Sequence, residues 1–547
     1  MRISIGFSGA AGSGVNTSGL LLGQLLSKKG YSVLGDKEYA SIIKGDNNDF
    51  FLYISDTDYF ITQTIDYFFA FDDYAVTKNT NLYTLKQVEN IKDQTTKFKN
   101  TFCFGAALKL LGIPFEEGKQ KLAELYSADI LEQNIVCLQQ GYDFLVENPQ
   151  WKVENLGVEK KFMFGNEVIA KGAIASGMDF YGAYPMTPAS SLIDVVTEEF
   201  QRMNQNIPEN KKNVFFQGED EIAVSISMLG AKFAGKRAAC GTSGGGFALM
   251  TESISFSNQA EIGGLYILSQ RDGPSTGTPT FTGQGDLNYA LNASFGDTFP
   301  IVLAPSTFEE SYRLIGKALN RSDQYQHPVI YLIDKQLSEG YLSIDPKALI
   351  AEEINRGKLF TGPKYEGDYR RYAESDDGIS PYLIPGTENG EFITTSYEHD
   401  ETGATNEDPI MKKAQQDKRD RKLGTFIHQE FNENFYGYEI INPDAEVFFI
   451  TYGVNRYVLA DYVKDRKDFG LIIMKVFQPF DMRLKTFLDE KCAKIKLLTF
   501  VEMNASGQMQ ERVTNKCWLH DKKREGKISH HRKYTLYPIF LEEIQGN

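Results

Sequence analysis

The chain has 547 residues, 41% hydrophobic and 24% charged, which is long enough for several domains and ordinary for a globular protein. Its 58 basic and 73 acidic residues give a net charge of −15, which argues against a nucleic-acid partner. No run of 18 apolar residues occurs, and the N-terminus does not resemble a signal peptide, so we expect neither a membrane span nor export.

The positions of the cysteines bear on which metal sites and disulfides the chain could form. None of the five lies in a CxxC pair, which argues against a metal or iron–sulfur site built by this chain alone. The same spacing argues against a disulfide framework and favours a reducing, cytoplasmic location. They are Cys103, Cys137, Cys240, Cys492 and Cys517.

The first predicted domain covers residues 1–150. A short strand at 3–7, a helix at 20–29 and a second strand at 31–34 predict a β-loop-α-β unit and hence a parallel sheet. Between the first strand and the helix, Gly9, Gly12 and Gly14 belong to a loop, GAAGSG, that could cradle a phosphate on backbone amides. A tight turn without a ligand explains this loop about as well.

Three further segments follow. Residues 160–345 alternate strands and helices and predict a doubly wound α/β domain. Residues 346–430 form a long connecting segment, whose many Tyr and Ile residues favour an ordered excursion over a disordered one. Residues 431–547 predict a C-terminal α/β domain. In residues 160–345 we expect strands at 181–184, 238–242, 264–268, 301–303 and 329–332.

Three consecutive acids, Glu219 to Glu221, open a predicted helix in the second domain. Ile222, Ile226, Leu229 and Phe233 follow at i, i+4, i+7 and i+11, the spacing of one helix face. Acids in a first helical turn are favoured by the helix dipole and often only cap the helix. A carboxylate that faced a dry cleft there could instead act as an acid or base.

Two other segments follow predicted strands, where ligands bind in open α/β sheets. In Tyr184-Pro185-Met186-Thr187-Pro188, two prolines fix the backbone around one hydroxyl, either as a rigid turn or as a donor to a small acid. Arg271, after the strand at 264–268, could bind a carboxylate with two parallel hydrogen bonds or form a surface ion pair. Spacing alone leaves both pairs of alternatives open.

Six motifs in one order then carry a family resemblance. They are GNEVIAKGAIASGMDFYGAYPMTPASS, QGEDEIAVSISMLGAKFAG, GTSGGGFALMTE, QRDGPSTGTPTFTGQGDL, the DGISP stretch and VEMNASGQMQE. Together they resemble the alpha subunit of 2-oxoacid:ferredoxin oxidoreductases with a gamma domain fused at the N-terminus, and the resemblance covers the chain end to end. FSGAAGSGVNTSGLLLGQLL and EYASIIKGDNNDFFLYIS resemble the gamma part.

The resemblance implies an enzyme that decarboxylates a 2-oxoacid, passes electrons to ferredoxin and forms an acyl-coenzyme A. It implies three α/β units: the gamma domain, a pyrimidine-side thiamine-binding domain and a transketolase-C-like domain. Thiamine diphosphate, its magnesium and a [4Fe-4S] cluster are expected on a partner beta subunit, in an alpha2beta2 assembly. This chain alone would then be catalytically incomplete, and no metal site is expected on it.

The resemblance also implies residue roles. Glu221, or Glu219 if the register slips, matches the glutamate that hydrogen-bonds the aminopyrimidine of the cofactor, while Thr187 and Arg271 match the residues that contact the substrate carboxylate. Tyr184 and Ser243 are expected to line the substrate pocket. The gamma domain is expected to close over coenzyme A, with Gly9, Gly12 and Gly14 as a possible contact.

Two positions depart from the family pattern. Phe281 and Tyr382 stand where relatives often have basic residues near the far end of the substrate. Two missing cations would leave the second carboxylate of 2-oxoglutarate unpaired, so the residues favour an apolar or aromatic 2-oxoacid although 2-oxoglutarate is commonest in the family. The alternatives are another thiamine-dependent enzyme, such as a transketolase-like one, and a non-catalytic scaffold chain of the same fold.

Overall fold

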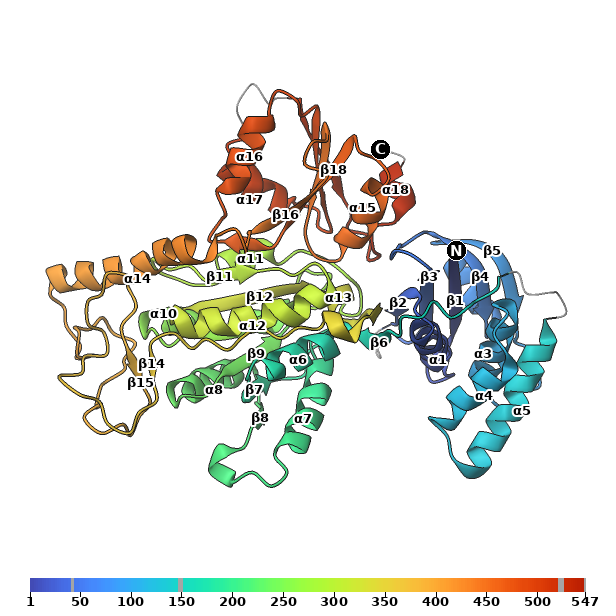
Figure 1. Ribbon diagram of the computed structural model, residues 1–547, viewed down its shortest axis with the longest axis horizontal. Helices are drawn as coiled ribbons and strands as arrows, with labels where there is room; N and C mark the ends of the chain where they lie inside the picture. The colour runs from blue at the N-terminus through green and yellow to red at the C-terminus, as the bar shows by residue number, and fades with distance from the viewer. Residues whose placement is uncertain (41–43, 146–150, 520–525, 546–547) are drawn as a thin grey trace.

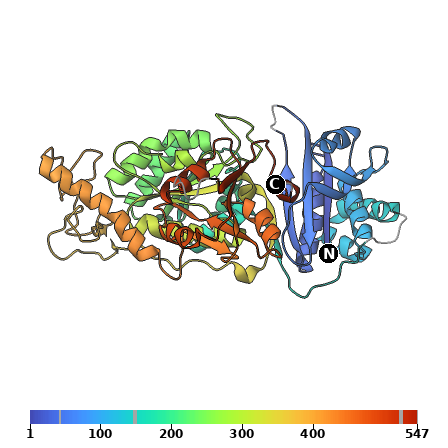
Figure 2. The same ribbon diagram turned by 90° about the horizontal axis from the view of Figure 1, so that it is seen from above.

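The computed structural model describes residues 1–40, 44–145, 151–519 and 526–545, which form three sheet-centred domains and a long arm (Figure 1). The N-terminal domain lies at one end of the long axis and the arm at the other (Figure 2). The α/β fold class with several open sheets is confirmed, whereas the position of the first predicted boundary, residues 149–150, lies outside the described residues.

The N-terminal sheet is mixed rather than parallel, which corrects the prediction. β3 lies between β1 and β2 and is antiparallel to both, so the two strands of the predicted unit are not neighbours. The order is β5-β4-β1-β3-β2-β13-β6. Its strands are β1 (Arg2–Ala10), β2 (Ser32–Glu38), β3 (Asn47–Ser55), β4 (Thr64–Ala70), β5 (Thr84–Asn90), β6 (Lys161–Phe164) and β13 (Tyr341–Ile344).

The last two strands of that sheet come from the first and last parts of the segment 160–345. β13 pairs antiparallel with β2 on one side and with β6 on the other. The second predicted domain is therefore not self-contained, because its two ends extend the sheet of the first domain. This pairing fixes the N-terminal domain directly against the rest of the chain.

Both faces of the N-terminal sheet are buried, as the continuous apolar run of β3 requires. Phe50, Leu52 and Ile54 point into a core with the domain's own helices, whereas Phe51 and Tyr53 point into a core shared with the other domains. The helices are α1 (Val15–Lys28), α2 (Asp73–Thr80), α3 (Lys99–Leu110), α4 (Phe115–Ala123) and α5 (Ala128–Phe144).

The central sheet has the order β19-β11-β12-β10-β9-β7-β8 and is parallel except for β19. The five predicted strands are all present, and β8 was missed. β19 comes from the C-terminal domain and closes one edge. The strands are β7 (Phe180–Ala183), β8 (Val214–Gln217), β9 (Ala238–Thr242), β10 (Gly264–Gln270), β11 (Ile301–Leu303), β12 (Pro328–Asp334) and β19 (Val476–Gln478).

Helices cover both faces of this central sheet (Figure 1). Along β10, Leu265 and Ile267 belong to the core that includes α6, α7 and α12, whereas Tyr266 and Leu268 belong to the core that includes α8 and α10. The doubly wound prediction is thus confirmed. These helices are α6 (Gly165–Ala175), α7 (Ser191–Met203), α8 (Glu221–Phe233), α10 (Thr251–Gln259) and α12 (Phe308–Gln324).

The connecting segment 346–430 is described throughout and ends in α14 (Pro409–Glu430), the long helix at the edge of Figure 1. It contains one small parallel pair, β14 (Leu359–Phe360) with β15 (Tyr382–Leu383). No helix in the described part of the chain is long and apolar enough to cross a membrane.

The C-terminal sheet has the order β16-β18-β17-β20-β21, with β16 antiparallel and the rest parallel. The α/β domain predicted for residues 431–547 is thus present. Its elements are β16 (Tyr438–Ile441), β17 (Val447–Thr451), α15 (Asn455–Val463), β18 (Phe469–Met474), α16 (Arg483–Lys491), β20 (Leu497–Glu502), α17 (Gln508–Lys516), β21 (Ile528–Arg532) and α18 (Leu541–Gln545).

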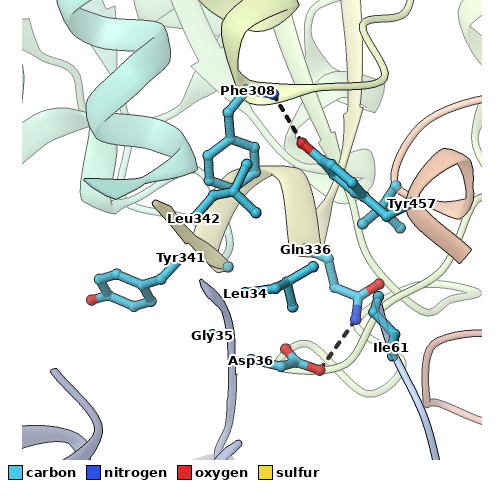
Figure 3. A pocket seen from close by; sticks show the side chains of 11 residues that line it. Leu34, Gly35, Asp36, Ile61, Phe308, Gln336, Tyr341, Leu342 and Tyr457 are labelled. Carbon is cyan, nitrogen blue, oxygen red and sulfur yellow. Dashed lines mark hydrogen bonds between the residues drawn. The ribbon is translucent and has the colours of Figure 1, made fainter. Parts of the chain in front are cut away.

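All three domains meet at one seam, shown in Figure 3. The Gln336 amide donates to Asp36 Oδ2 at 3.2 Å, and the backbone N–H of Phe308 donates to the Tyr457 hydroxyl at 3.3 Å. The cavity left between these side chains is about 10 Å³, no more than one water molecule needs. The seam therefore joins the domains and has no room for a ligand.

Candidate functional site

The chemically important residues lie where strands of the central sheet end. β7, β8, β9 and β10 run parallel, so the segments after them meet at one edge of the sheet. Those segments begin at Tyr184, Gly218, Ser243 and Arg271. The structure thus brings together four of the motifs that are far apart in the sequence.

Glu221 is the buried acid of the three. It is the first residue of α8 and only 3% exposed, whereas Glu219 is exposed. Asp220 caps the helix, since its side chain accepts from the backbone N–H of Ala223 at 2.9 Å. The helix start therefore has its cap without using Glu221, whose carboxylate is left to face the strand ends.

The apolar face predicted for α8 is wrong in part. Ile222 and Ile226 are 51% and 46% exposed, and Val224 and Met228 are buried in their place. The helix begins with Glu221 turned inward, and residues three, four and seven positions later share that inward face. The sequence spacing identified a helix correctly but assigned its buried side by apolarity alone.

Glu221 is packed against the turn after β9. The Thr242 hydroxyl donates to Glu221 Oε1 at 3.4 Å, and Ser243 is fully buried with no partner for its hydroxyl among the described residues. A Cβ on Gly246 would lie 2.2 Å from Glu221 Oε1. Glycine is needed there so that the backbone of α9 (Gly244–Leu249) can approach the carboxylate.

Arg271 and Thr187 are also brought together. An Arg271 Nη1 N–H donates to the backbone carbonyl oxygen of Thr187 at 2.7 Å. The bond uses the carbonyl of Thr187 and not its hydroxyl, which has no hydrogen bond to the described side chains. Burial lowers the pKa of Arg271, and the nearby carboxyl of Asp286 opposes that effect. Tyr184, at the start of the same turn, is 39% exposed. The pair presents a guanidinium and a hydroxyl on one side of the edge.

Asp286 belongs to this site and was missed by the sequence analysis. Its carboxyl lies against the first turn of α9, because a Cβ on Gly244 would be 2.7 Å from Asp286 Oδ2. Burial raises its pKa to about 6, although the positive charge of Arg271 acts in the opposite direction. The only sequence signal was its place in the motif QRDGPSTGTPTFTGQGDL, fifteen residues after Arg271.

Phe281 lies on the loop that begins with Arg271 but faces the N-terminal domain. Its carbonyl accepts from the backbone N–H of Asp272 at 3.1 Å, and its ring meets that of Tyr537 edge to face at 5.8 Å. It lines a pocket of about 330 Å³ together with Tyr39 and Lys78. Phe281 is therefore close to Arg271 along the backbone, with its side chain in a neighbouring pocket.

Tyr382 is not brought to this site within the chain. It is 8% exposed, and its hydroxyl donates to the backbone carbonyl of Phe233, the last residue of α8. Glu221 is the first residue of the same helix, so about 18 Å of helix separates the two ends. The expectation that Tyr382 lines a common pocket with Glu221 is wrong, because its hydroxyl caps the far end of α8.

The three glycines of GAAGSG are not equivalent. Gly9 lies inside β1, where a Cβ would meet Phe71 at 2.6 Å, and Gly14 precedes α1, where a Cβ would meet Asn100 at 2.8 Å. Only Gly12, at φ +83°, faces open space. Gly9 and Gly14 are therefore explained by packing, and the open part of the loop is at Gly12.

No group of three or more His, Cys, Asp or Glu side chains that could hold a metal occurs among the residues described. None of the five cysteines forms a disulfide in the part of the chain that the structure describes, and four of them are buried.

Comparison with known proteins shows which family the chain belongs to. Residues 171–418 match the family model described as pyruvate flavodoxin/ferredoxin oxidoreductase, thiamine diphosphate-binding, and residues 4–90 match the pyruvate ferredoxin/flavodoxin oxidoreductase model. The 2-oxoacid:ferredoxin oxidoreductase subunit alpha of Saccharolobus solfataricus is 30% identical, over 93% of this chain and 92% of that protein. The chain belongs to this family of alpha subunits.

Two further matches extend the comparison to other members of the family. The 2-oxoglutarate synthase subunit KorA of Methanocaldococcus jannaschii is 30% identical over 65% of this chain and 92% of that protein. A solved structure, the 2-oxoglutarate:ferredoxin oxidoreductase from Magnetococcus marinus with 2-oxoglutarate, coenzyme A and succinyl-CoA bound, matches with a TM-score of 0.87 and 26% identity, covering 100% of this chain and 98% of that one.

These findings decide among the functions predicted from the sequence. The chain is a subunit of a 2-oxoacid:ferredoxin oxidoreductase, and its central domain is of the thiamine diphosphate-binding type. The transketolase-like enzyme and the non-catalytic scaffold are not favoured.

Proposed function

We propose that Glu221, Thr187 and Arg271 are this chain's contribution to an active site that oxidatively decarboxylates a 2-oxoacid. One observation carries the proposal: a buried carboxylate and a guanidinium–threonine pair lie at the same edge of one parallel sheet. Ligands bind at such edges in open α/β sheets. Arg271 and the Thr187 hydroxyl are suited to hold the substrate carboxylate.

Glu221 fits the aminopyrimidine ring of thiamine diphosphate. It is a buried carboxylate whose only described side-chain partner is the weakly placed Thr242 hydroxyl at 3.4 Å, so it can accept a hydrogen bond from a ring nitrogen. The cofactor supplies the carbanion chemistry when bound. Glu221 would hold the proton shared with that nitrogen, and its exclusion from water strengthens this hydrogen bond. Glu219 is too exposed for the same role.

We propose that a beta subunit completes the site, with the diphosphate, magnesium and a [4Fe-4S] cluster on its side, and that two copies of each chain form an alpha2beta2 complex which reduces ferredoxin. The surface beside Glu221 supports a protein partner, because Ile222, Ile226 and Leu249 are each 46–51% exposed at the edge of the site. The lack of disulfides among the described cysteines suits a cytoplasmic complex.

Coenzyme A would bind against the N-terminal domain, near Gly12 of the GAAGSG loop. Support comes from the open space at Gly12 and from the buried Ser13 hydroxyl and the buried Oδ1 of Asn16, which have no hydrogen-bond partner among the residues described. The similar structure from Magnetococcus marinus contains coenzyme A. A structure of the complex with coenzyme A bound elsewhere would exclude this placement.

The substrate tail would extend from Arg271 into the neighbouring pocket that Phe281 lines. An aromatic ring favours an apolar or aromatic tail, whereas the similar solved structure contains 2-oxoglutarate. Initial rates of the reconstituted complex with 2-oxoglutarate, pyruvate, branched-chain and aryl 2-oxoacids distinguish the two. Tyr382 has no part in this choice, because it lies at the other end of α8.

Glu221→Gln is the main test of the proposed function. The amide keeps the shape but cannot share a proton as a carboxylate does, so we expect turnover of the reconstituted complex to fall by on the order of 10²–10⁴-fold. Assembly, measured by size-exclusion chromatography with light scattering, should be unchanged. Glu219→Gln is the matched control and should retain turnover. Near-normal activity of Glu221→Gln would refute the assignment.

Arg271→Ala tests the substrate side. Loss of a charged partner for the substrate carboxylate should lower kcat/KM for the 2-oxoacid. The expected loss of transition-state stabilisation is about 2–5 kcal/mol. Because the proposed coenzyme A contact at Gly12 follows β1 of another domain, whereas Arg271 follows β10, the KM for coenzyme A should change less than that for the 2-oxoacid. Unchanged 2-oxoacid kinetics would exclude Arg271 from the substrate site.

A further inference from the structure

Asp286 is placed next to the proposed substrate site by two independent contacts. Its backbone N–H donates to Oε1 of Gln270, the last residue of β10, at 3.1 Å, which holds it beside Arg271. Its carboxyl lies against Gly244, where no other residue type leaves room for it. The aspartate is thus fixed between the strand that precedes Arg271 and the glycine turn that contacts Glu221.

The carboxyl of Asp286 has few partners. No hydrogen bond reaches its side-chain oxygens from any residue that the structure describes, and no nitrogen of Arg271 lies within 4.0 Å of them. The ionisable groups that face it are Arg271, Tyr289 on α11 (Leu287–Leu291) and Tyr452 after β17. Burial raises the pKa of both tyrosines, so Arg271 is the one cation acting on Asp286 among the described groups.

Two negative groups would then compete for one guanidinium. If Arg271 binds the carboxylate of a 2-oxoacid, an ionised Asp286 repels that carboxylate and offsets part of the charge that attracts it. A neutral Asp286 does neither. Because burial already raises the pKa of Asp286 to about 6, the proton it needs is available close to physiological pH.

We propose that Asp286 takes up a proton from solvent when the 2-oxoacid carboxylate binds at Arg271, and so makes substrate affinity depend on pH. This inference rests on the proposed function of Arg271. Asp286 is a positioning residue, since it acts on the substrate through Arg271. No bond of the substrate is made or broken in this step; one proton moves from solvent to the Asp286 carboxylate.

The direction of the pH effect follows from linkage. A bound anion raises the pKa of Asp286 further, so the substrate binds more tightly when Asp286 is protonated. The affinity for the substrate should be highest below the pKa of Asp286 in the free protein, which is about 6. It should weaken as the pH rises above that value. Above the pKa of the complex, affinity becomes constant again.

Binding of unreactive analogues provides the test. Oxamate and N-oxalylglycine are amide analogues of pyruvate and 2-oxoglutarate, and their binding to the assembled complex can be followed by calorimetry from pH 5.5 to 8. In the wild type we expect the dissociation constant to rise on the order of tenfold over this range. Titrations in two buffers of different ionisation enthalpy should show proton uptake near pH 7.

Asp286→Asn should abolish both effects. The amide is isosteric but neutral at every pH, so affinity should be tight and constant, as for the protonated aspartate. The wild-type proton uptake needs no variant, so a complex that binds the analogue at pH 7 without taking up a proton overturns the proposal. An Asp286→Asn complex that keeps the wild-type pH slope also overturns it.

Arg271→Ala separates this inference from the proposed function. Loss of analogue binding in Arg271→Ala together with an unchanged slope in Asp286→Asn would overturn only the role of Asp286. Analogue binding that survives Arg271→Ala would overturn the proposed substrate site, and the role of Asp286 with it. If Asp286→Asn removes the pH dependence of analogue binding and Arg271→Ala removes analogue binding itself, the results support both the role of Asp286 and the proposed substrate site.

Discussion

Helices α8 and α14 both depart from the rule that apolar residues are buried and charged residues are exposed. α8 exposes apolar residues, whereas α14 buries charged ones. α8 leaves Ile222 and Ile226 about half exposed beside the candidate site. α14 buries the side chains of Lys418 and Lys422, which are 0% and 2% exposed, against the central domain. Both helices nevertheless bury charged side chains: α8 buries Glu221, and α14 buries two lysines that pair with Glu261 of another segment.

The contacts of Glu261 explain the burial of α14. Its carboxylate accepts hydrogen bonds from Lys418 at 2.8 Å and pairs with Lys422 at 2.6 Å. Burial alone would raise the pKa of Glu261, but the two lysines outweigh this effect and lower it. For Lys422, burial outweighs the attraction of Glu261 and lowers the pKa to about 7. One acid therefore serves as counter-ion to two lysines on a helix face that sequence patterns would assign to solvent.

Glu261→Gln should have the largest effect on stability. Two lysines would be left buried without their counter-ion, and breaking a buried ion pair in this way destabilises by about 3–5 kcal/mol. Chemical unfolding of the chain, followed by circular dichroism, measures the change. The matched control is Asp417→Asn, which breaks the exposed pair of Asp417 with Lys413 on the outer face of α14 and should change stability by less than about 0.5 kcal/mol. Equal effects would show that Glu261 does not hold the helix.

The two faces of α8 give the second contrast. Met228 is fully buried, so Met228→Ala should destabilise by about 2–5 kcal/mol through lost burial and the cavity left behind. Ile226, which sequence spacing placed in the core, is 46% exposed, and Ile226→Ala should change stability by less than about 0.5 kcal/mol. Chemical unfolding of both variants checks the orientation of the helix. A larger loss in Ile226→Ala would favour the face predicted from apolarity.

These contrasts show what the sequence could predict of the fold. Runs such as 264–268 are apolar on both faces, which identified the buried parallel strands of the central sheet. The mixed N-terminal sheet could not be foreseen, because β3 inserts between β1 and β2 and β13 joins from 300 residues away. Such pairings depend on contacts between distant segments, which local periodicity does not encode.

The candidate site shows the same limit. Thr187 and Arg271 could be placed at one edge because each follows a strand, and the structure puts them 2.7 Å apart through the Thr187 carbonyl. Tyr382 could not be placed, since it lies in the connecting segment, where no strand order fixes its position. Asp286 went unnoticed because its proximity to Gly244 depends on the path of the loop after Arg271.

Ile222→Glu and Ile226→Glu should have the smallest effect on the isolated chain and a large one on its assembly. Both side chains are about half exposed, so either charge should change the stability of the chain alone by less than about 0.5 kcal/mol. If this face packs against the beta subunit, a buried charge should weaken association on the order of 10–100-fold.

Analytical ultracentrifugation of the variants with the purified beta subunit measures the difference. The control is Asp417→Asn, which removes an exposed charge from the outer face of α14. Wild-type association of both isoleucine variants would show that the exposed apolar face of α8 is not covered by that subunit, and the proposed partner surface would have to lie elsewhere around Glu221.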